Sequence, residues 1–163
     1  GYLWYNVTYK SIYLIGGCFF RTQNEVMQML DTVKNPVSDT FSYWGKSVEK
    51  VVGKGNYSMD RSKTLASNKT AYARLYMLGN PTSRSDLEGN ECATTPSFQV
   101  DSFASGTKPL TKAYKIDDAS HKAMVDMGYR RTYGPELMEN ADGSIKRVVS
   151  RYSRVYAGKL LNE

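Results

Sequence analysis

Alternation of apolar and polar positions predicts a β-hairpin in the middle of the chain. In residues 70–78 small or aliphatic side chains alternate with larger or charged ones, which is the period of two expected for a strand with two different faces. The two sets are Ala71, Ala73, Leu75 and Met77, and Tyr72, Arg74 and Tyr76. A second apolar run, residues 95–104, can return antiparallel to the first across the polar segment 79–91, which we interpret as a solvated loop.

The strongest helical pattern follows this hairpin. Apolar and small residues recur at helical spacing from Pro109, a residue tolerated in a first turn, to Gly128, a typical helix end. The predicted core-facing stripe consists of Ala113, Ile116, Ser120, Ala123, Met124 and Met127. We therefore predict one long helix between Pro109 and Gly128.

A second hairpin is predicted after the helix. Residues 129–133 and 145–156 have strand character, Gly134-Pro135 predicts a break or bulge, and Asp142-Gly143 is a strong turn signal. Basic and apolar residues share both faces of the last strand, so neither is cleanly a core face. Our hypothesis from this pattern is that the strand passes from its own core into contact with a neighbour or a ligand.

Two further helices are predicted in the first third of the chain. Thr22 followed by Glu25 forms a capping box, which predicts a helix that ends at Asn35-Pro36. Helical spacing resumes over residues 37–52, with Gly45 as a weak point. Residues 53–69 are rich in Gly, Ser, Lys and Asn, and we predict a mobile loop there.

The first 21 residues are set apart. Alternation over residues 3–9 predicts a strand, and Gly16-Gly17 offers a turn. We expect residues 1–21 to be an extension and residues 22–163 to form a single domain. The predicted fold class is α+β, with a mainly antiparallel sheet of two β-hairpins flanking a long helix and a further N-terminal helix.

Composition agrees with a folded globular protein. The chain has 163 residues, of which 40% are hydrophobic and 23% charged, and this length suits one core. Its longest apolar run, residues 12–20, is less than half of the roughly 20 residues that cross a bilayer. We expect no membrane partner and no secretion signal. The two cysteines, Cys18 and Cys92, lie far apart and are expected to be reduced and buried.

Residues fit for catalysis or cofactor binding are sparse. The single histidine, His121, has no second histidine or cysteine nearby, and the neighbours Asp117 and Asp118 point to different sides of a helix. Phosphate-binding glycine motifs and a nucleophile elbow are missing from the sequence. The acidic residues of the first hairpin tip lack calcium-binding spacing. We predict no catalytic residue, no metal site, no cofactor and no enzymatic activity.

Positive charge is concentrated in the final hairpin. The net charge of +6 admits an acidic partner, and residues 129–159 hold seven basic residues against three acidic ones. Tyrosines alternate with these charges, as at a phosphate contact or a polar protein interface. A solvated sheet face is the alternative. The candidate residues for contact with DNA or a neighbouring subunit are Arg130, Arg131, Lys146, Arg147, Arg151 and Arg154.

Three stretches of the sequence resemble a known family. They are residues 73–81 (ARLYMLGNP), residues 96–100 (PSFQV), and residues 127–132 (MGYRRT) leading to residues 145–152 (IKRVVSRY). Together with the order helix, hairpin, helix, hairpin, they resemble the tail terminator, or tail completion, proteins of long-tailed bacteriophages, and the minor capsid-type proteins in phages of Gram-positive bacteria. The likeness covers about residues 69–156.

The resemblance implies a structural virion protein assembled in the host cytoplasm. It implies a homo-oligomeric ring, of six copies, that caps the tail tube and joins the neck, with genomic DNA passing through its lumen. The implied partners are the major tail tube protein and a neck or head-completion protein. Two alternatives stay open: a neck or head-completion connector, and a basic nucleic-acid-binding domain outside any particle. A small hydrolase or transferase is the least favoured.

Overall fold

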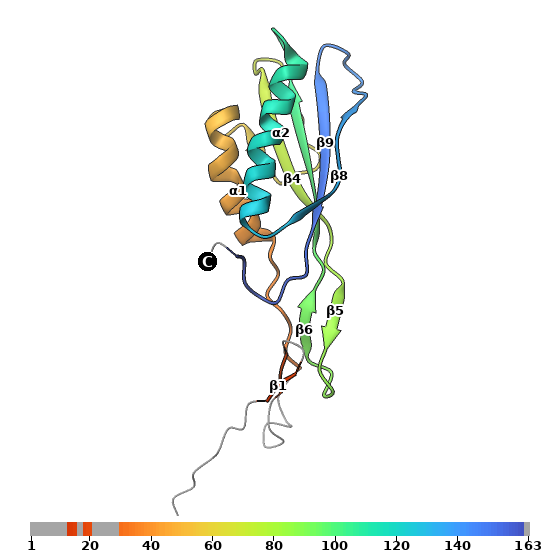
Figure 1. The fold of residues 1–163 in the computed structure, drawn as a ribbon. Coiled ribbons are helices and arrows are strands. Elements are labelled where there is room, and N and C mark those ends of the chain that lie inside the picture. Colours follow the sequence, from red (N-terminus) through yellow and green to blue (C-terminus); the bar gives the residue numbers. More distant parts are fainter. Residues whose placement is uncertain (1–12, 16–17, 21–29, 162–163) are drawn as a thin grey trace, which may run out of the picture.

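Two helices and three small sheets make up the described part of the chain (Figure 1). The computed structural model describes the backbone of residues 13–15, 18–20 and 30–161, and the side chains of residues 30–161. The elements are β1 (Tyr13–Ile15), β2 (Cys18–Phe20), α1 (Val37–Val52), β3 (Tyr57–Ser58), β4 (Ala71–Gly79), β5 (Thr82–Ser85), β6 (Glu91–Thr94), β7 (Ser97–Ala104), α2 (Pro109–Asp126), β8 (Arg130–Met138) and β9 (Lys146–Ser153). The predicted α+β class is confirmed.

The main sheet has five strands in the order β3-β4-β7-β9-β8. The short β3 runs parallel to β4, and all other neighbours are antiparallel. Both helices lie on one face of this sheet (Figure 1). Strand β9 is therefore an interior strand, which places the basic segment of the chain between β7 and β8.

Helix α1 has the predicted bounds and faces the core with Trp44 and Val48, which are fully buried. The indole N–H of Trp44 donates a hydrogen bond of 2.9 Å to the Ser120 hydroxyl of α2. Gly45, the predicted weak point, is where the Tyr57 ring packs on the helix, and a Cβ there would lie 2.6 Å from that ring. The glycine thus permits a close approach at the cost of helix propensity.

Helix α2 begins at the predicted proline and confirms the predicted stripe. All six of the predicted core-facing residues are buried. Asp117 is buried as well, whereas Asp118 is exposed, so the two carboxylates point to different sides as expected. An acidic residue on the buried side of a helix requires a partner for its charge.

The first hairpin is longer than the sequence predicts. Strands β4 and β7 pair antiparallel, as expected, but the segment 79–91 is not a loop throughout. It contains β5 and the start of β6, which pair to extend the hairpin beyond the end of the helices (Figure 1). All residues of β5 are exposed, so this extension lacks the alternation of apolar side chains by which a strand is usually predicted.

The prediction of a helix that ends at Asn35-Pro36 is wrong for residues 30–35, which have no regular structure. The first part of that predicted helix, residues 22–29, lies outside the described residues. Instead, this segment is bound to the first hairpin, because the backbone N–H groups of Asp31 and Val33 donate to the side chains of Asn90 and Glu91. The strand predicted over residues 3–9 and the turn at Gly16-Gly17 also lie outside the described residues. Strands β1 and β2 pair antiparallel.

Residues 53–69 are more ordered in their contacts than a loop prediction implies. They contain β3, and Leu65 is buried against Tyr72 and Phe103 on the sheet face opposite the helices. This second, small core explains why the sheet has no face that is purely polar. The mobility of the segment stays a prediction.

The second hairpin confirms the predicted break. Strand β8 continues through Gly134-Pro135, but its register against β9 shifts between Arg131 and Glu136. Gly134 has a φ of +84°, and a Cβ there would lie 2.2 Å from the Val149 carbonyl oxygen of β9. A glycine is required here by both the backbone conformation and the close approach.

The expectation of reduced cysteines is wrong. Cys92, at the start of β6, is disulfide-bonded, and no free cysteine is found among the described residues. The sequence contains one other cysteine, Cys18. Spacing along the chain concealed the bond, because cysteines far apart in sequence reveal a pairing only through the fold. Disulfides form and persist in oxidising surroundings.

Candidate functional site

The six basic residues predicted as a site do not form one patch. Register places Arg147 and Arg151 of β9 on the sheet face opposite the helices, whereas Arg131 of β8 points toward α2. Lys146 lies at the end of the hairpin and donates to the Gly143 carbonyl oxygen. The remaining two, Arg130 and Arg154, line a groove at the other end of the sheet. Apart from Lys146, the residues of the predicted site therefore divide among three environments.

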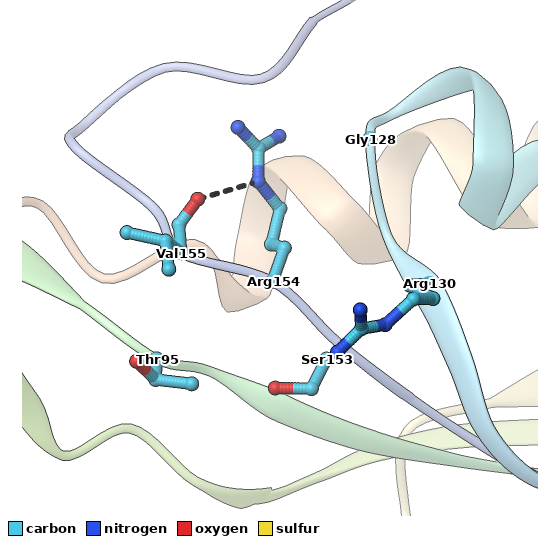
Figure 2. A pocket seen from close by; sticks show the side chains of 6 residues that line it. All are labelled: Thr95, Gly128, Arg130, Ser153, Arg154 and Val155. Carbon is cyan, nitrogen blue, oxygen red and sulfur yellow. Dashed lines mark hydrogen bonds between the residues drawn. The ribbon is translucent and has the colours of Figure 1, made fainter.

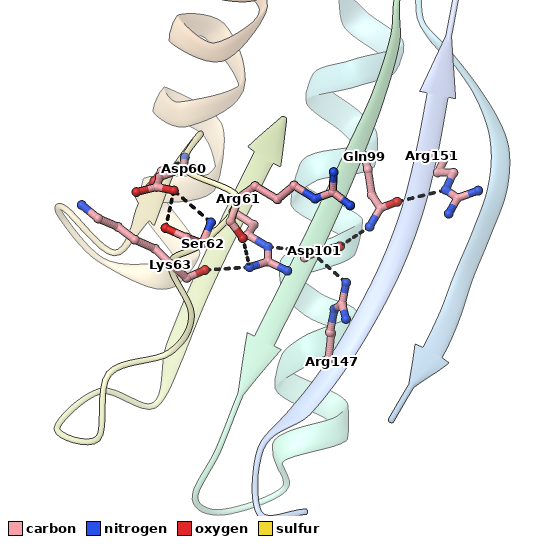
Figure 3. Close-up of polar contacts among 10 residues, drawn as sticks. Asp60, Arg61, Ser62, Lys63, Gln99, Asp101, Arg147 and Arg151 are labelled. Carbon is pink, nitrogen blue, oxygen red and sulfur yellow. Dashed lines mark hydrogen bonds and ion pairs between the residues drawn. The ribbon is translucent and has the colours of Figure 1, made fainter. Parts of the chain in front are cut away.

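The first environment is a buried ionic cluster centred on Asp101 of β7. The Asp101 carboxylate accepts from Arg74 Nε at 2.6 Å, from Arg147 at 3.2 Å and from Gln99 Nε2 at 2.9 Å. Asp101 is fully buried and Arg74 is nearly so. Figure 3 shows Gln99, Asp101 and Arg147 meeting across neighbouring strands.

This ionic cluster also holds the segment 60–65 against the sheet. A terminal nitrogen of Arg74 donates to the carbonyl oxygens of Arg61 and Lys63, at 2.6 and 2.8 Å. Asp60 closes a turn in the same segment by accepting from the Ser62 backbone and hydroxyl. Because both guanidinium groups bind the one buried Asp101 carboxylate, these two arginines are committed to the fold, and the cluster keeps one net positive charge.

Arg151 lies at the open edge of the same face. Its Nε donates to Gln99 Oε1 at 3.0 Å, and its guanidinium lies 5.1 Å from the centre of the Tyr133 ring on β8. Both Arg151 and Tyr133 are exposed. This pair is the part of the predicted basic strand that remains accessible to a neighbour or to a phosphate group.

The second environment is a polar network beneath α2. Asp117 accepts from Arg131 at 2.8 Å and from the Ser150 hydroxyl at 2.6 Å. Arg131 also donates to the Tyr152 hydroxyl, which lies 3.3 Å from His121 Nδ1. The network joins the helix to β8 and β9 through charge-assisted hydrogen bonds.

Burial governs the protonation of this network. Burial raises the pKa of Asp117, while the Ser150 hydrogen bond and the Arg131 charge act in the opposite direction. Burial also raises the pKa of Tyr152 to about 12, and it lowers the pKa of His121 together with the charge of Arg131. Serine, histidine and aspartate are residues that catalyse hydrolysis elsewhere, but here Ser150 and Asp117 are fully buried and out of reach of a substrate. The network fixes α2 on the sheet.

The third environment is a shallow groove of about 350 Å³ (Figure 2). Arg130 and Arg154 line it together with Thr95, Gly128, Ser153 and Val155. Arg154 donates to the carbonyl oxygens of Met127 and Val155, and its guanidinium lies near the rings of Tyr129 and Tyr156. Arg130 is exposed and extends from the edge strand, so it is the cation of this groove best placed for an external partner.

A second groove, of about 450 Å³, lies between α1 and α2. Its lining includes three lysines, two aspartates and small apolar residues: Ser47, Lys50, Val51, Lys115, Asp118, Ala119, Lys122, Ala123 and Asp126. Sequence analysis did not select this region, because helix-surface lysines are ordinarily solvated. The topology makes a groove of it by placing the two helices side by side.

Three residues central to these environments were also missed: Arg74, Asp101 and Asp117. A signal existed for two of them, since Arg74 alternates with two tyrosines on one strand face and Asp117 is adjacent to Ile116 on the apolar stripe. A charged residue at such a position predicts a buried partner, but the sequence does not name the partner.

The described residues contain no group of three or more histidine, cysteine, aspartate or glutamate side chains arranged to hold a metal ion. Within the same part of the chain, neither helix has the length and apolar character needed to cross a bilayer. No family model matches the chain, and no curated protein is similar enough to be counted as a relative.

Proposed function

We propose that this protein is a structural part of a long-tailed bacteriophage, in which copies form a ring, of six subunits, that caps the tail tube and joins it to the neck. The observation that carries the proposal is the arm made by β5 and β6, which extends past the helices (Figure 1). All residues of β5 are exposed, so this side of the arm is available for contact between subunits.

The arrangement of two hairpins on either side of α2 in the chain supports the same reading. It agrees with the family resemblance of residues 69–156, and β9 joins the two hairpins into one sheet by pairing with β7. A rigid sheet with an arm at one end can make head-to-tail contacts between copies. Such contacts form a closed ring when the rotations between successive neighbours add up to a full turn.

Capping is then a geometric function. One face of the ring binds the last ring of the tail tube protein and prevents further addition, while the other face receives the neck or head-completion protein. Genomic DNA passes through the lumen. Arg130 and Arg151 are the accessible candidates for contact with DNA or a neighbouring subunit, because both are exposed.

Electron microscopy tests the proposal directly. The purified protein is imaged alone and after mixing with isolated tail tubes that lack a cap. We expect rings with a central opening and a single density at one end of each tube. A protein that stays monomeric and never decorates a tube end would contradict the proposal, and rings bound to filled heads but not to tails would favour the connector alternative.

Exposed lysines favour a second candidate, the nucleic-acid-binding domain. Lys46, Lys50, Lys115 and Lys122 are all exposed on the two helices. They lie on the helical layer, away from the final hairpin where the sequence concentrates positive charge. This function predicts a monomer or dimer whose affinity for DNA falls steeply as salt is raised, whereas a ring-forming virion protein retains its oligomeric state over the same salt range.

A further inference from the structure

The tip of the β5–β6 hairpin presents an apolar residue to solvent. Leu87 has a fractional exposure of 93%, the highest of the large hydrophobic residues described. Leu30, at 60%, lies next to the same turn, with its Cδ1 atom 3.6 Å from the position of a Cβ on Gly89. Leu87 is the more exposed of the two, and its place at the end of the projecting arm makes it available to a partner.

The turn that carries Leu87 is already ordered. The Asp86 carboxylate accepts from the backbone N–H groups of Glu88 and Asn90, at 3.0 and 2.8 Å, and from the Asn90 side-chain amide at 2.8 Å. Asn90 in turn accepts from the Asp31 backbone at 2.9 Å. These bonds fix the turn before any partner arrives, so docking loses less conformational entropy than it would with a flexible loop.

The groove between α1 and α2 has the complementary chemistry. Its apolar lining consists of Val51, which is 43% exposed, and the small residues Ala119 and Ala123. Three lysines and two aspartates also line the groove, which leaves one net positive charge. One of the aspartates, Asp126, accepts a hydrogen bond from Tyr43 at 3.2 Å. An apolar side chain followed by a carboxylate fits such a groove.

We propose that the hairpin tip of one copy docks into the α1–α2 groove of a neighbouring copy. Leu87 packs against Val51 and Ala119, and the Glu88 carboxylate pairs with Lys115 or Lys122. This inference rests on the proposed ring, for which it supplies the contact between subunits. Figure 1 shows the hairpin extending past the end of the helices and away from them, so the contact is made between copies. Tip and groove are different surfaces, and the interface is therefore head-to-tail.

Two kinds of variant test the two sides of this contact, the hairpin tip and the groove. Leu87→Ser removes the tip anchor, and Lys115→Glu with Lys122→Glu reverses the charge of the groove. All three residues are exposed, so each variant is expected to fold, which the urea midpoint checks. The matched control is Leu137→Ser, since Leu137 is 46% exposed on β8, outside both surfaces.

Analytical ultracentrifugation then measures assembly. We expect the tip variant and the groove variant to raise the concentration for half-assembly by at least about tenfold, and the control to leave it unchanged. Mixing the tip variant with the groove variant should give a one-to-one dimer, because one intact tip meets one intact groove and the chain then stops. Glu88→Lys combined with the groove variant should restore higher oligomers.

The outcomes distinguish this inference from the proposed function. Rings that form equally well from the wild type, the tip variant and the groove variant would overturn the docking contact and leave the ring in place. A wild-type chain that is monomeric at every concentration would overturn both.

Discussion

Arg74 and Asp101 form an ion pair of 2.6 Å between adjacent strands, with both side chains buried. Asp101 also receives Arg147 from the strand on its other side, so a single carboxylate joins β4, β7 and β9. Removing a charge from water is costly, and only a complete set of partners offsets that cost. The cluster therefore stabilises one register of three strands.

Asp101→Asn should destabilise the fold by about 3–5 kcal/mol, because it leaves the buried Arg74 without its counter-charge. Urea unfolding followed by Trp fluorescence measures the free energy of unfolding. The control is Asp118→Asn, an exposed aspartate, which should change that free energy by about 0.5 kcal/mol or less. Equal urea midpoints for the two variants would show that the ion pair contributes nothing.

Arg147→Glu and Arg151→Glu should differ sharply although the two residues are four apart on one strand. The first places a second carboxylate against the buried Asp101 and should cost at least about 3 kcal/mol of unfolding free energy. The second removes a partly buried hydrogen bond to Gln99 and a ring contact, and should cost about 1.5 kcal/mol or less.

This difference decides how assembly experiments on the basic strand are designed. If a chain that carries Arg147→Glu fails to assemble, the cause can be either the destabilised fold or a lost contact between subunits. Arg151→Glu alone is the variant that tests contact with DNA or a neighbour. A stable Arg147→Glu protein, with the wild-type urea midpoint, would refute our assignment of Arg147 to the buried cluster.

The single histidine should give stability a pH dependence of its own. Burial, with the charge of Arg131, lowers the pKa of His121 in the folded state below its usual 6.5. As pH falls below 6.5 the unfolded chain takes up a proton that the folded chain does not, so stability declines until pH passes the folded pKa. Above 6.5 the contribution is fully present.

His121→Gln isolates this effect, because no second histidine titrates in the chain. The difference in unfolding free energy between wild type and variant should fall steadily between pH 6.5 and 5. The C2 proton of the histidine, followed by NMR, gives the folded pKa independently. A value above 6.5 would contradict the prediction, as would a difference that does not change with pH.

Gly134→Ala should disrupt the pairing of β8 with β9. The added Cβ would lie 2.2 Å from the Val149 carbonyl oxygen, and the backbone has a φ of +84°, so the strands must separate. We expect a loss of unfolding free energy of about 2 kcal/mol or more and faster amide exchange in β8.

Gly143→Ala is the matched control in the same hairpin. No atom lies within 4 Å of a Cβ at Gly143, and its φ is outside the left-handed region. This variant should keep the wild-type midpoint and exchange rates. If both glycine variants unfold alike, the close approach at Gly134 is not what holds the strand.

Local patterns in the sequence determined most of the elements. Helical spacing located α1 and α2, alternation located β4, an apolar run located β7, and Gly134-Pro135 marked the irregularity in β8. Each of these signals lies within a few neighbouring residues, so it can be recognised in the sequence without knowledge of the fold. Where alternation is missing, as in the exposed β5, the strand was not predicted.

Only the tertiary structure decided which charges are available. The sequence placed six basic residues in one hairpin, but Arg131 pairs with Asp117, Arg147 with Asp101, and Arg154 with a helix-end carbonyl. Alternation assigns a side chain to one of two faces, whereas its partner depends on strand order and register across segments far apart in the chain. Cys92 shows the same limit, because its bond follows from proximity in the fold and not from spacing in the sequence.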